Sequence, residues 1–201
     1  MKKLAAILFL LFFISNSFAQ KAKIDKGKWK DLKDIQEYKV EFDYHHLEIA
    51  DYESEEAFLK DKMQLREERK EGDGERFKKS WFADRQDKYE PQFIDFFNSY
   101  HEDFNVKVSN KREDANYVMH IQTTFIYPGY NVGVWREDSK LRVTVTIYSI
   151  KNPNNILFSA NIKGIKGGGA KGFDYNSGDR IAYSYALLAN YIAKKIRIVS
   201  K

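Results

Sequence analysis

The chain lacks cysteine: none of its 201 residues is one. This absence excludes disulfide bonds, thiolate metal sites, cysteine nucleophiles and attachment of a lipid to a cysteine side chain. Proline is scarce, with three residues, and the one long apolar run lies near the N-terminus. Stability must therefore come from packing, for which 15 Phe, 13 Tyr and 3 Trp residues supply large side chains.

The sequence also lacks the short motifs of common catalytic and cofactor sites. It contains no HExxH, no GxSxG and no Gly-Lys-Ser/Thr phosphate loop. The four histidines are His45, His46, His101 and His120. The adjacent pair lies on a predicted strand, where neighbouring side chains point to opposite faces and do not share an ion. We therefore predict no catalytic residue, no cofactor and no metal site.

One glycine-rich stretch, Gly164–Gly178, lies between a predicted strand and a predicted helix, where phosphate-binding loops also occur. Its glycines have the spacing of neither a phosphate loop nor a dinucleotide-binding motif. We interpret it as a loop that turns back over the sheet, with Ser177 or Asp179 capping the next helix. A binding role for this loop stays open.

Charge of one sign forms no long block in the chain. The formal net charge is +5, and acidic and basic residues are interleaved, as in Glu53–Glu75. A nucleic-acid-binding protein gathers basic side chains on one face or segment. The sequence therefore predicts no nucleic-acid partner.

The first twenty residues have the composition of an export signal. Two lysines open the chain, an apolar run spans Leu4–Ile14, and the small residues Ser17 and Ala19 precede Gln20. The run is shorter than the ~20 residues that span a bilayer. We predict a signal peptide over residues 1–19, cleaved between Ala19 and Gln20, and a periplasmic or secreted protein without a membrane span.

Periodicity predicts the elements of the remaining chain. Alternating apolar residues predict five strands, and apolar residues three and four apart predict helices. Ser54 begins the first helix and Gly72 and Gly74 end it, whereas Pro91 predicts a break in the second. The predicted strands are Gln36–Ile49, Phe104–Val108, Tyr117–Phe125, Leu141–Ser149 and Ile156–Gly164; the helices cover Phe58–Leu65, Phe77–Tyr100 (with the break near Lys88–Pro91) and Ile181–Ile196.

These elements predict an α+β fold in a single domain over residues 34–201. A mostly antiparallel (mixed) sheet of about five strands packs helices on one face, and the C-terminal helix comes last. Residues 20–33 are rich in lysine, with Trp29 and Leu32 as the large apolar groups, and predict a short mobile leader.

The connection Tyr127–Ser139 is the best candidate for a binding site. It is longer than the ~2–5 residues of an ordinary hairpin loop and carries three rings, Tyr127, Tyr130 and Trp135. Exposed rings suit a protein or glycan partner. The alternative is that the rings fold back onto the edge of the sheet or pair across an extended hairpin.

Three stretches resemble a recurring cell-envelope domain: Arg112–Tyr130, Leu141–Gly164 and Arg180–Ile196. Its members include the periplasmic part of the curli secretion channel, lipoprotein activators of penicillin-binding proteins and the amino-terminal domain of the Tol-system protein B. The shared pattern begins with Ala, Asp or Asn, Tyr and a hydrophobic residue at the start of a strand, here Ala115–Val118. A long hairpin follows, then a strand that ends in a polar turn, here Lys151–Asn155, and a last helix with spaced alanines, here Ala186–Ala193. The resemblance implies a non-enzymatic adaptor or assembly factor.

We therefore expect an exported binding or assembly module that contacts an envelope protein or glycan. Two alternatives stay open. One is an envelope hydrolase that uses Asp/Glu or His, and it requires a cleft with converging carboxylates or histidines. The other is a carrier of a small amphipathic ligand, and it requires an apolar cavity between the sheet and the helix Phe93–Phe104.

Overall fold

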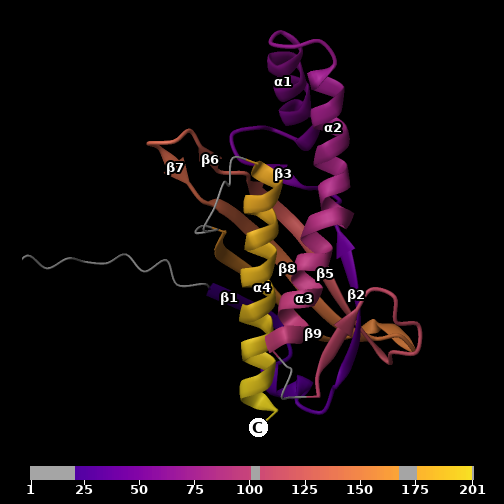
Figure 1. Ribbon diagram of the computed structural model, residues 1–201. Coiled ribbons are helices and arrows are strands. Elements are labelled where there is room, and N and C mark those ends of the chain that lie inside the picture. Colours follow the sequence, from indigo (N-terminus) through magenta and orange to yellow (C-terminus); the bar gives the residue numbers. More distant parts are fainter. Residues whose placement is uncertain (1–20, 101–104, 168–175, 201) are drawn as a thin grey trace, which may run out of the picture.

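A computed structural model describes residues 21–100, 105–167 and 176–200 (Figure 1). The predicted signal peptide, His101, Phe104 and most of the glycine-rich stretch lie outside the described residues. The strands are β1 (Lys21–Lys26), β2 (Glu37–Asp43), β3 (Glu48–Ile49), β4 (Lys107–Ser109), β5 (Tyr117–Tyr127), β6 (Tyr130–Asn131), β7 (Arg136–Glu137), β8 (Ser139–Ser149) and β9 (Asn152–Gly167). The helical segments are η1 (Trp29–Leu32), α1 (Glu55–Glu67), α2 (Asp73–Asp84), η2 (Arg85–Tyr89), α3 (Glu90–Tyr100) and α4 (Ser177–Val199).

Seven strands form one mixed sheet in the order β1-β9-β8-β5-β2-β4, with β3 also paired to β5. The long pairs β1–β9, β9–β8 and β8–β5 are antiparallel, whereas β2 runs parallel to β4 and β5. The strands β6 and β7 form a separate two-stranded ribbon. The predicted α+β class, the single domain and the mostly antiparallel mixed sheet are confirmed.

The core lies on one face of the sheet. Inward residues alternate with partly exposed polar ones, so that Val143, Val145 and Ile147 of β8 are fully buried while the threonines between them are not. The helices α3 and α4 lie side by side over this face, and α4 crosses β8 and β9 (Figure 1). Phe93, Phe97 and Tyr185 fill the layer between helices and sheet. The predicted helices on one face and last C-terminal helix are confirmed.

The helix α1 begins where the sequence predicts. The Ser54 hydroxyl accepts a hydrogen bond from the amide of Ala57 at 3.1 Å, which satisfies one of the unpaired donors of the first turn. The prediction that Gly74 ends this helix is wrong, because Gly74 lies in the first turn of α2. Gly72, at φ 76°, makes the turn, and the Glu67 carboxylate accepts from the amides of both glycines.

The helices α2 and α3 form one long rod that runs past the end of the sheet (Figure 1). The predicted break near Pro91 is wrong: the π-helical turn η2 joins the two helices, and the amide of Glu90 bonds to the carbonyl of Arg85. A π-helical turn is wider than an α-helical one, so the ring of Pro91 at the start of α3 is accommodated without an interruption.

The lysine-rich segment before residue 34 is part of the sheet. The prediction of a mobile leader is wrong here, because β1 pairs with β9 from Lys21 to Lys26 and η1 buries Leu32 completely. Trp29 packs on Phe158 with ring centroids 4.5 Å apart. The burial of Leu32 and the partial burial of Trp29 supply the stabilisation that a free leader lacks.

Gly27→Ala is expected to destabilise the protein more than Gly133→Ala. Both glycines have positive φ, 70° and 86°, so alanine carries a similar backbone cost of about 1–2 kcal/mol at each. At Gly27 the added Cβ collides with the carbonyl of Leu157 in β9, whereas at Gly133 nothing lies within 4 Å. Urea unfolding measures both losses. Equal losses would contradict the pairing of β1 with β9.

Candidate functional site

A hairpin arm, residues 127–139, projects from the same end of the sheet as α1 and α2 (Figure 1). The ribbon β6–β7 forms its outer part, with Tyr130 opposite Glu137 and Asn131 opposite Arg136. At the tip the amide of Val132 donates to the carbonyl of Trp135 at 3.0 Å, and the Asn131 side chain accepts from the amide of Gly133 at 3.1 Å. These bonds set the backbone of the tip.

The arm tip carries four exposed apolar or aromatic side chains. Trp135 is 70% exposed, Val134 is 90% exposed and Val132 is 67% exposed, and Tyr130 is exposed as well. Large apolar side chains grouped in this way on a surface are typical of interaction sites. Tyr130 and Trp135 are predicted binding residues, whereas the two valines are not among the predicted residues. Their signal is the pattern Val-Gly-Val-Trp at the centre of a long hairpin connection.

Tyr127, the third predicted ring, lies at the arm's base and not at its tip. Its hydroxyl donates to the Glu137 carboxylate at 2.7 Å, and the Lys140 ammonium lies 4.6 Å from the ring centroid. Burial and the hydrogen bond to Glu137 raise the pKa of Tyr127 to about 12. The structure thus brings Tyr130 and Trp135 to one end of the arm and separates Tyr127 from them.

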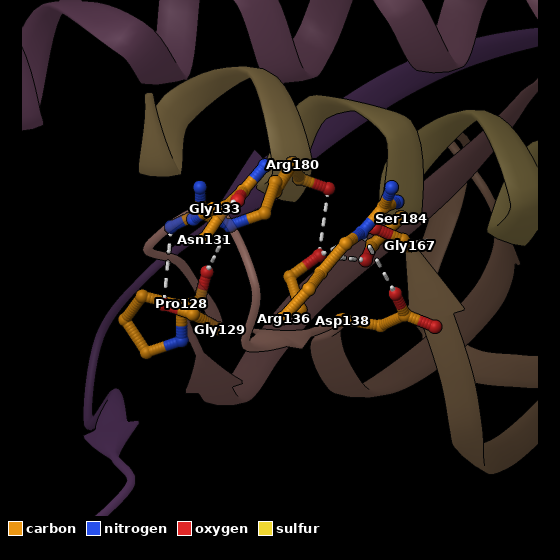
Figure 2. A network of polar contacts seen from close by, with 10 residues as sticks. Pro128, Gly129, Asn131, Gly133, Arg136, Asp138, Gly167, Arg180 and Ser184 are labelled. Atoms are coloured by element: carbon orange, nitrogen blue, oxygen red, sulfur yellow. Dashed lines mark hydrogen bonds and ion pairs between the residues drawn. The ribbon is translucent and has the colours of Figure 1, made fainter. Parts of the chain in front are cut away.

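The arm's base is held by the first turn of α4 (Figure 2). The guanidinium of Arg180 donates from Nε to the carbonyl of Pro128 at 3.1 Å and from Nη2 to that of Gly129 at 3.0 Å. Arg180 is 4% exposed. A buried guanidinium requires acceptors for its donors, and the two carbonyls supply them.

A second set of buried contacts holds the other side of the arm's base. The Ser139 hydroxyl donates to the carbonyl of Arg180 at 2.6 Å, and its oxygen lies 2.7 Å from the Ser184 oxygen (Figure 2). A Cβ at Gly167 would collide with all three groups, so only glycine fits where β9 passes this point. Both strands of the arm are therefore anchored to α4.

A surface groove of about 500 Å³ lies between the arm's base, the α1–α2 pair and the first turn of α4. We call it the basal groove. Its basic side chains outnumber its acidic ones by four to two. The lining residues are Phe58, Lys62, Arg66, Asp73, Arg76, Phe77, Ser80, Trp81, Asp84, Pro128, Gly129, Asn176, Ser177 and Arg180.

Asp84, the deeper of the two acids in the basal groove, packs against the start of α4. Its carboxylate occupies the space where a side chain at position 178 would lie, so Gly178 is required there. Burial raises the pKa of Asp84, although Lys88, 3.1 Å away, favours the charged form. Lys88 also contacts Asp179 at 2.9 Å and so ties α2 to α4.

The helix α4 is capped differently from the prediction. The expected caps Ser177 and Asp179 lie inside the first turn, and the Asn176 side chain accepts from the amide of Gly178 at 2.8 Å. Asparagine is as good a cap as serine or aspartate, so the sequence around Asn176 does not decide between the candidates.

The three described histidines, His45, His46 and His120, lie apart from the arm and the basal groove. His45 and His46 follow the end of β2 in a turn, with His46 at φ 59°, so their predicted position on one strand is wrong. The His45 ring contacts Asp43 at 2.6 Å, and His120 lies 3.7 Å from the same carboxylate. Within the described ranges, no group of three or more His, Asp or Glu side chains has the geometry to hold a metal ion.

Arg180→Ala is expected to loosen the arm while the core stays folded. Two carbonyls at the arm's base lose their donor, a change worth about 1–3 kcal/mol for buried groups. Hydrogen–deuterium exchange measures this as faster exchange of the amides in residues 129–137. Arg142→Ala is the control, since Arg142 lies on β8 but contacts Glu48 at the surface. Unchanged exchange in the arm would contradict the anchoring role of Arg180.

Asp84→Asn is expected to change how stability depends on pH. Because the folded-state pKa of Asp84 is raised, the folded protein holds this proton more tightly than the unfolded chain, whose pKa is about 3.9. The wild type should lose stability relative to the variant as pH rises from about 3.9 through the raised pKa. Urea unfolding across this pH range measures the difference. A difference that is constant, or that moves in the opposite direction, would contradict the burial of Asp84.

No known protein family matches this sequence, and neither does any curated protein. Among solved structures, a PelC variant from Paraburkholderia phytofirmans, solved as a dodecamer, is similar over 84% of this chain and 96% of that one. The two sequences are 14% identical and the TM-score is 0.35. These values are too low to carry a conclusion about family or function.

Proposed function

We propose that this protein is an exported binding or assembly module of the cell envelope that acts through protein contacts at the arm tip. The observation that carries the proposal is the group of exposed apolar side chains, Tyr130, Val132, Val134 and Trp135, at the end of an anchored arm. Trp and Tyr dominate the binding energy of protein interfaces when they enter a partner's pocket. The partner is a protein that offers an apolar pocket to Trp135.

The anchoring of the arm favours binding by the tip. Ordering a flexible loop at an interface costs free energy, and this cost weakens the affinity. Here the contacts of Arg180 and Ser139 with the arm's base, and the ribbon pairing farther out, order the backbone before a partner arrives. The rings can therefore enter a pocket at low entropic cost.

The predicted signal peptide supports an envelope address for this activity. Residues 1–19 carry the positive start, the apolar run and the small residues that an export signal needs. None of the helices in residues 21–100, 105–167 and 176–200 has the length and apolar character needed to cross a bilayer. Because the predicted signal peptide directs export, the proposed partner is an envelope protein.

A hydrolase with paired carboxylates is not favoured in the basal groove. Its two acids, Asp73 and Asp84, stand eleven positions apart on α2, a rise of about 16 Å along the helix. Paired carboxylates of glycoside hydrolases lie about 5–9.5 Å apart. The two acids therefore stand too far apart for that chemistry.

The carrier hypothesis is not favoured, because aromatic side chains fill the space between the sheet and α3. Phe93 and Phe97 are fully buried there, and they stack at 6.1 Å between ring centroids. The basal groove carries charged groups from α1, α2 and α4, in contrast to the apolar cavity that an amphipathic ligand requires.

Site-specific photocrosslinking in the native cell tests the proposal. A photoreactive phenylalanine derivative replaces Val134 at the tip or, as the control, Ile198 near the end of α4, which is 60% exposed. We expect a discrete crosslinked protein from position 134 and none from position 198. The double change Tyr130→Ser and Trp135→Ser should abolish the crosslink while stability changes by less than about 0.5 kcal/mol, because both side chains are exposed.

Two results would contradict binding by the tip. One is the same crosslinked protein from positions 134 and 198, which indicates random encounter. The other is a crosslink at position 134 that persists when both rings are replaced by serine.

A further inference from the structure

The basal groove is distinct from the arm tip, and its walls present a charge pattern of their own. Along α1, Phe58, Lys62 and Arg66 stand four residues apart and so lie on one face of the helix. On α2, Arg76 and Phe77 face the same space. One wall of the basal groove is therefore a stripe of cations beside aromatic rings.

The cations on this wall are incompletely balanced by acids within the basal groove. Arg76 pairs with Asp73, three positions before it on α2. Arg66 lies over the ring of Phe77 at 4.4 Å, and in the described part of the chain no carboxylate reaches ion-pair distance from it. Lys62 contacts Asp61 at 3.1 Å, an acid outside the lining. The guanidinium of Arg66 thus keeps its hydrogen-bond donors available on the solvent side.

The opposite wall carries charges of both signs. It contains Asn176 and Ser177 at the start of the 23-residue helix α4, together with Arg180. The N-terminus of a long helix carries a partial positive charge of about half a unit. Two acids lie beside it, Asp84 and Asp179, and they share the ammonium of Lys88 at 3.1 and 2.9 Å. This wall is therefore close to balanced in charge, and the cations of α1 and α2 decide the preference for a negatively charged group.

We propose that the basal groove binds a small ligand through a carboxylate or phosphate group held by Arg66 and Arg76, with the body of the ligand against Phe77. Guanidinium groups recognise both oxyanions through paired hydrogen bonds. The volume of about 500 Å³ lies within the ~300–1,000 Å³ of small-molecule sites. The ring of Phe77 offers an apolar surface next to the charged ones.

Binding of three sugars to the purified full-length protein tests this proposal and separates the two oxyanions. Glucuronate carries a carboxylate, glucose 6-phosphate carries a phosphate, and glucose has the same ring without charge. Amide chemical shifts in titrations measure each affinity. We expect at least one anionic sugar to bind with shifts in α1 and α2, and glucose to bind more weakly than that sugar. The anion that binds identifies which oxyanion the site takes.

Variants of the lining decide whether the anion lies in the basal groove. Arg66→Gln and Arg76→Gln should each weaken binding by about tenfold, since each removes charged hydrogen bonds. Arg69→Gln removes the same charge from an exposed position outside the lining and should leave the affinity unchanged. Asp73→Asn should strengthen binding, because it removes the competing partner of Arg76.

Three results would overturn the proposal: no binding of either anionic sugar, equal affinity for glucose, or equal effects of Arg66→Gln and Arg69→Gln. The proposal for the ligand site and the proposal for the arm tip can be contradicted independently of each other. Loss of the crosslink at position 134 leaves the titrations unaffected, and the lining variants leave the tip exposed.

Discussion

The burial of one guanidinium determines the arrangement of this end of the molecule. Arg180 lies on the first turn of a helix that the core holds in place, and its donors reach the carbonyls of Pro128 and Gly129. A charged group removed from water must be satisfied by such partners, so the chain at positions 128–129 has to pass directly over α4. The direction of the arm and one wall of the basal groove both follow from this contact.

Periodicity predicts most of the sheet because its inward residues are simple apolar side chains. Val143, Val145 and Ile147 alternate with polar residues, and this alternation is typical of a strand with one buried face. It fails at β1, where the side chains of an edge strand are mostly exposed and leave no apolar alternation to detect. No sequence pattern predicts the π-helical turn at Arg85–Tyr89 either. In an ordinary α-helix Pro91 would cause an interruption, and for this reason the sequence predicts a break there.

The two proposed sites differ in how much of each the sequence contains. The arm tip is a single continuous segment, so its length and its rings predict an exposed hairpin; the different role of Tyr127 depends on Glu137 and Lys140, which meet it only in the folded chain. The basal groove collects residues from α1, α2, the arm and α4. No local sequence pattern predicts a site whose residues lie more than a hundred positions apart in the chain.

The strand β1 has a consequence for how copies of this protein meet one another. It forms one border of the sheet, and the border carries Lys21, Lys23 and Lys26 beside one acid, Asp25, which lies 3.4 Å from Lys23. A strand from another molecule that added itself here would have to lay its backbone among three ammonium groups, and a second copy would bring three more. This border of the sheet is thereby protected against growth by edge-to-edge pairing, a safeguard that matters for a protein with long antiparallel strands.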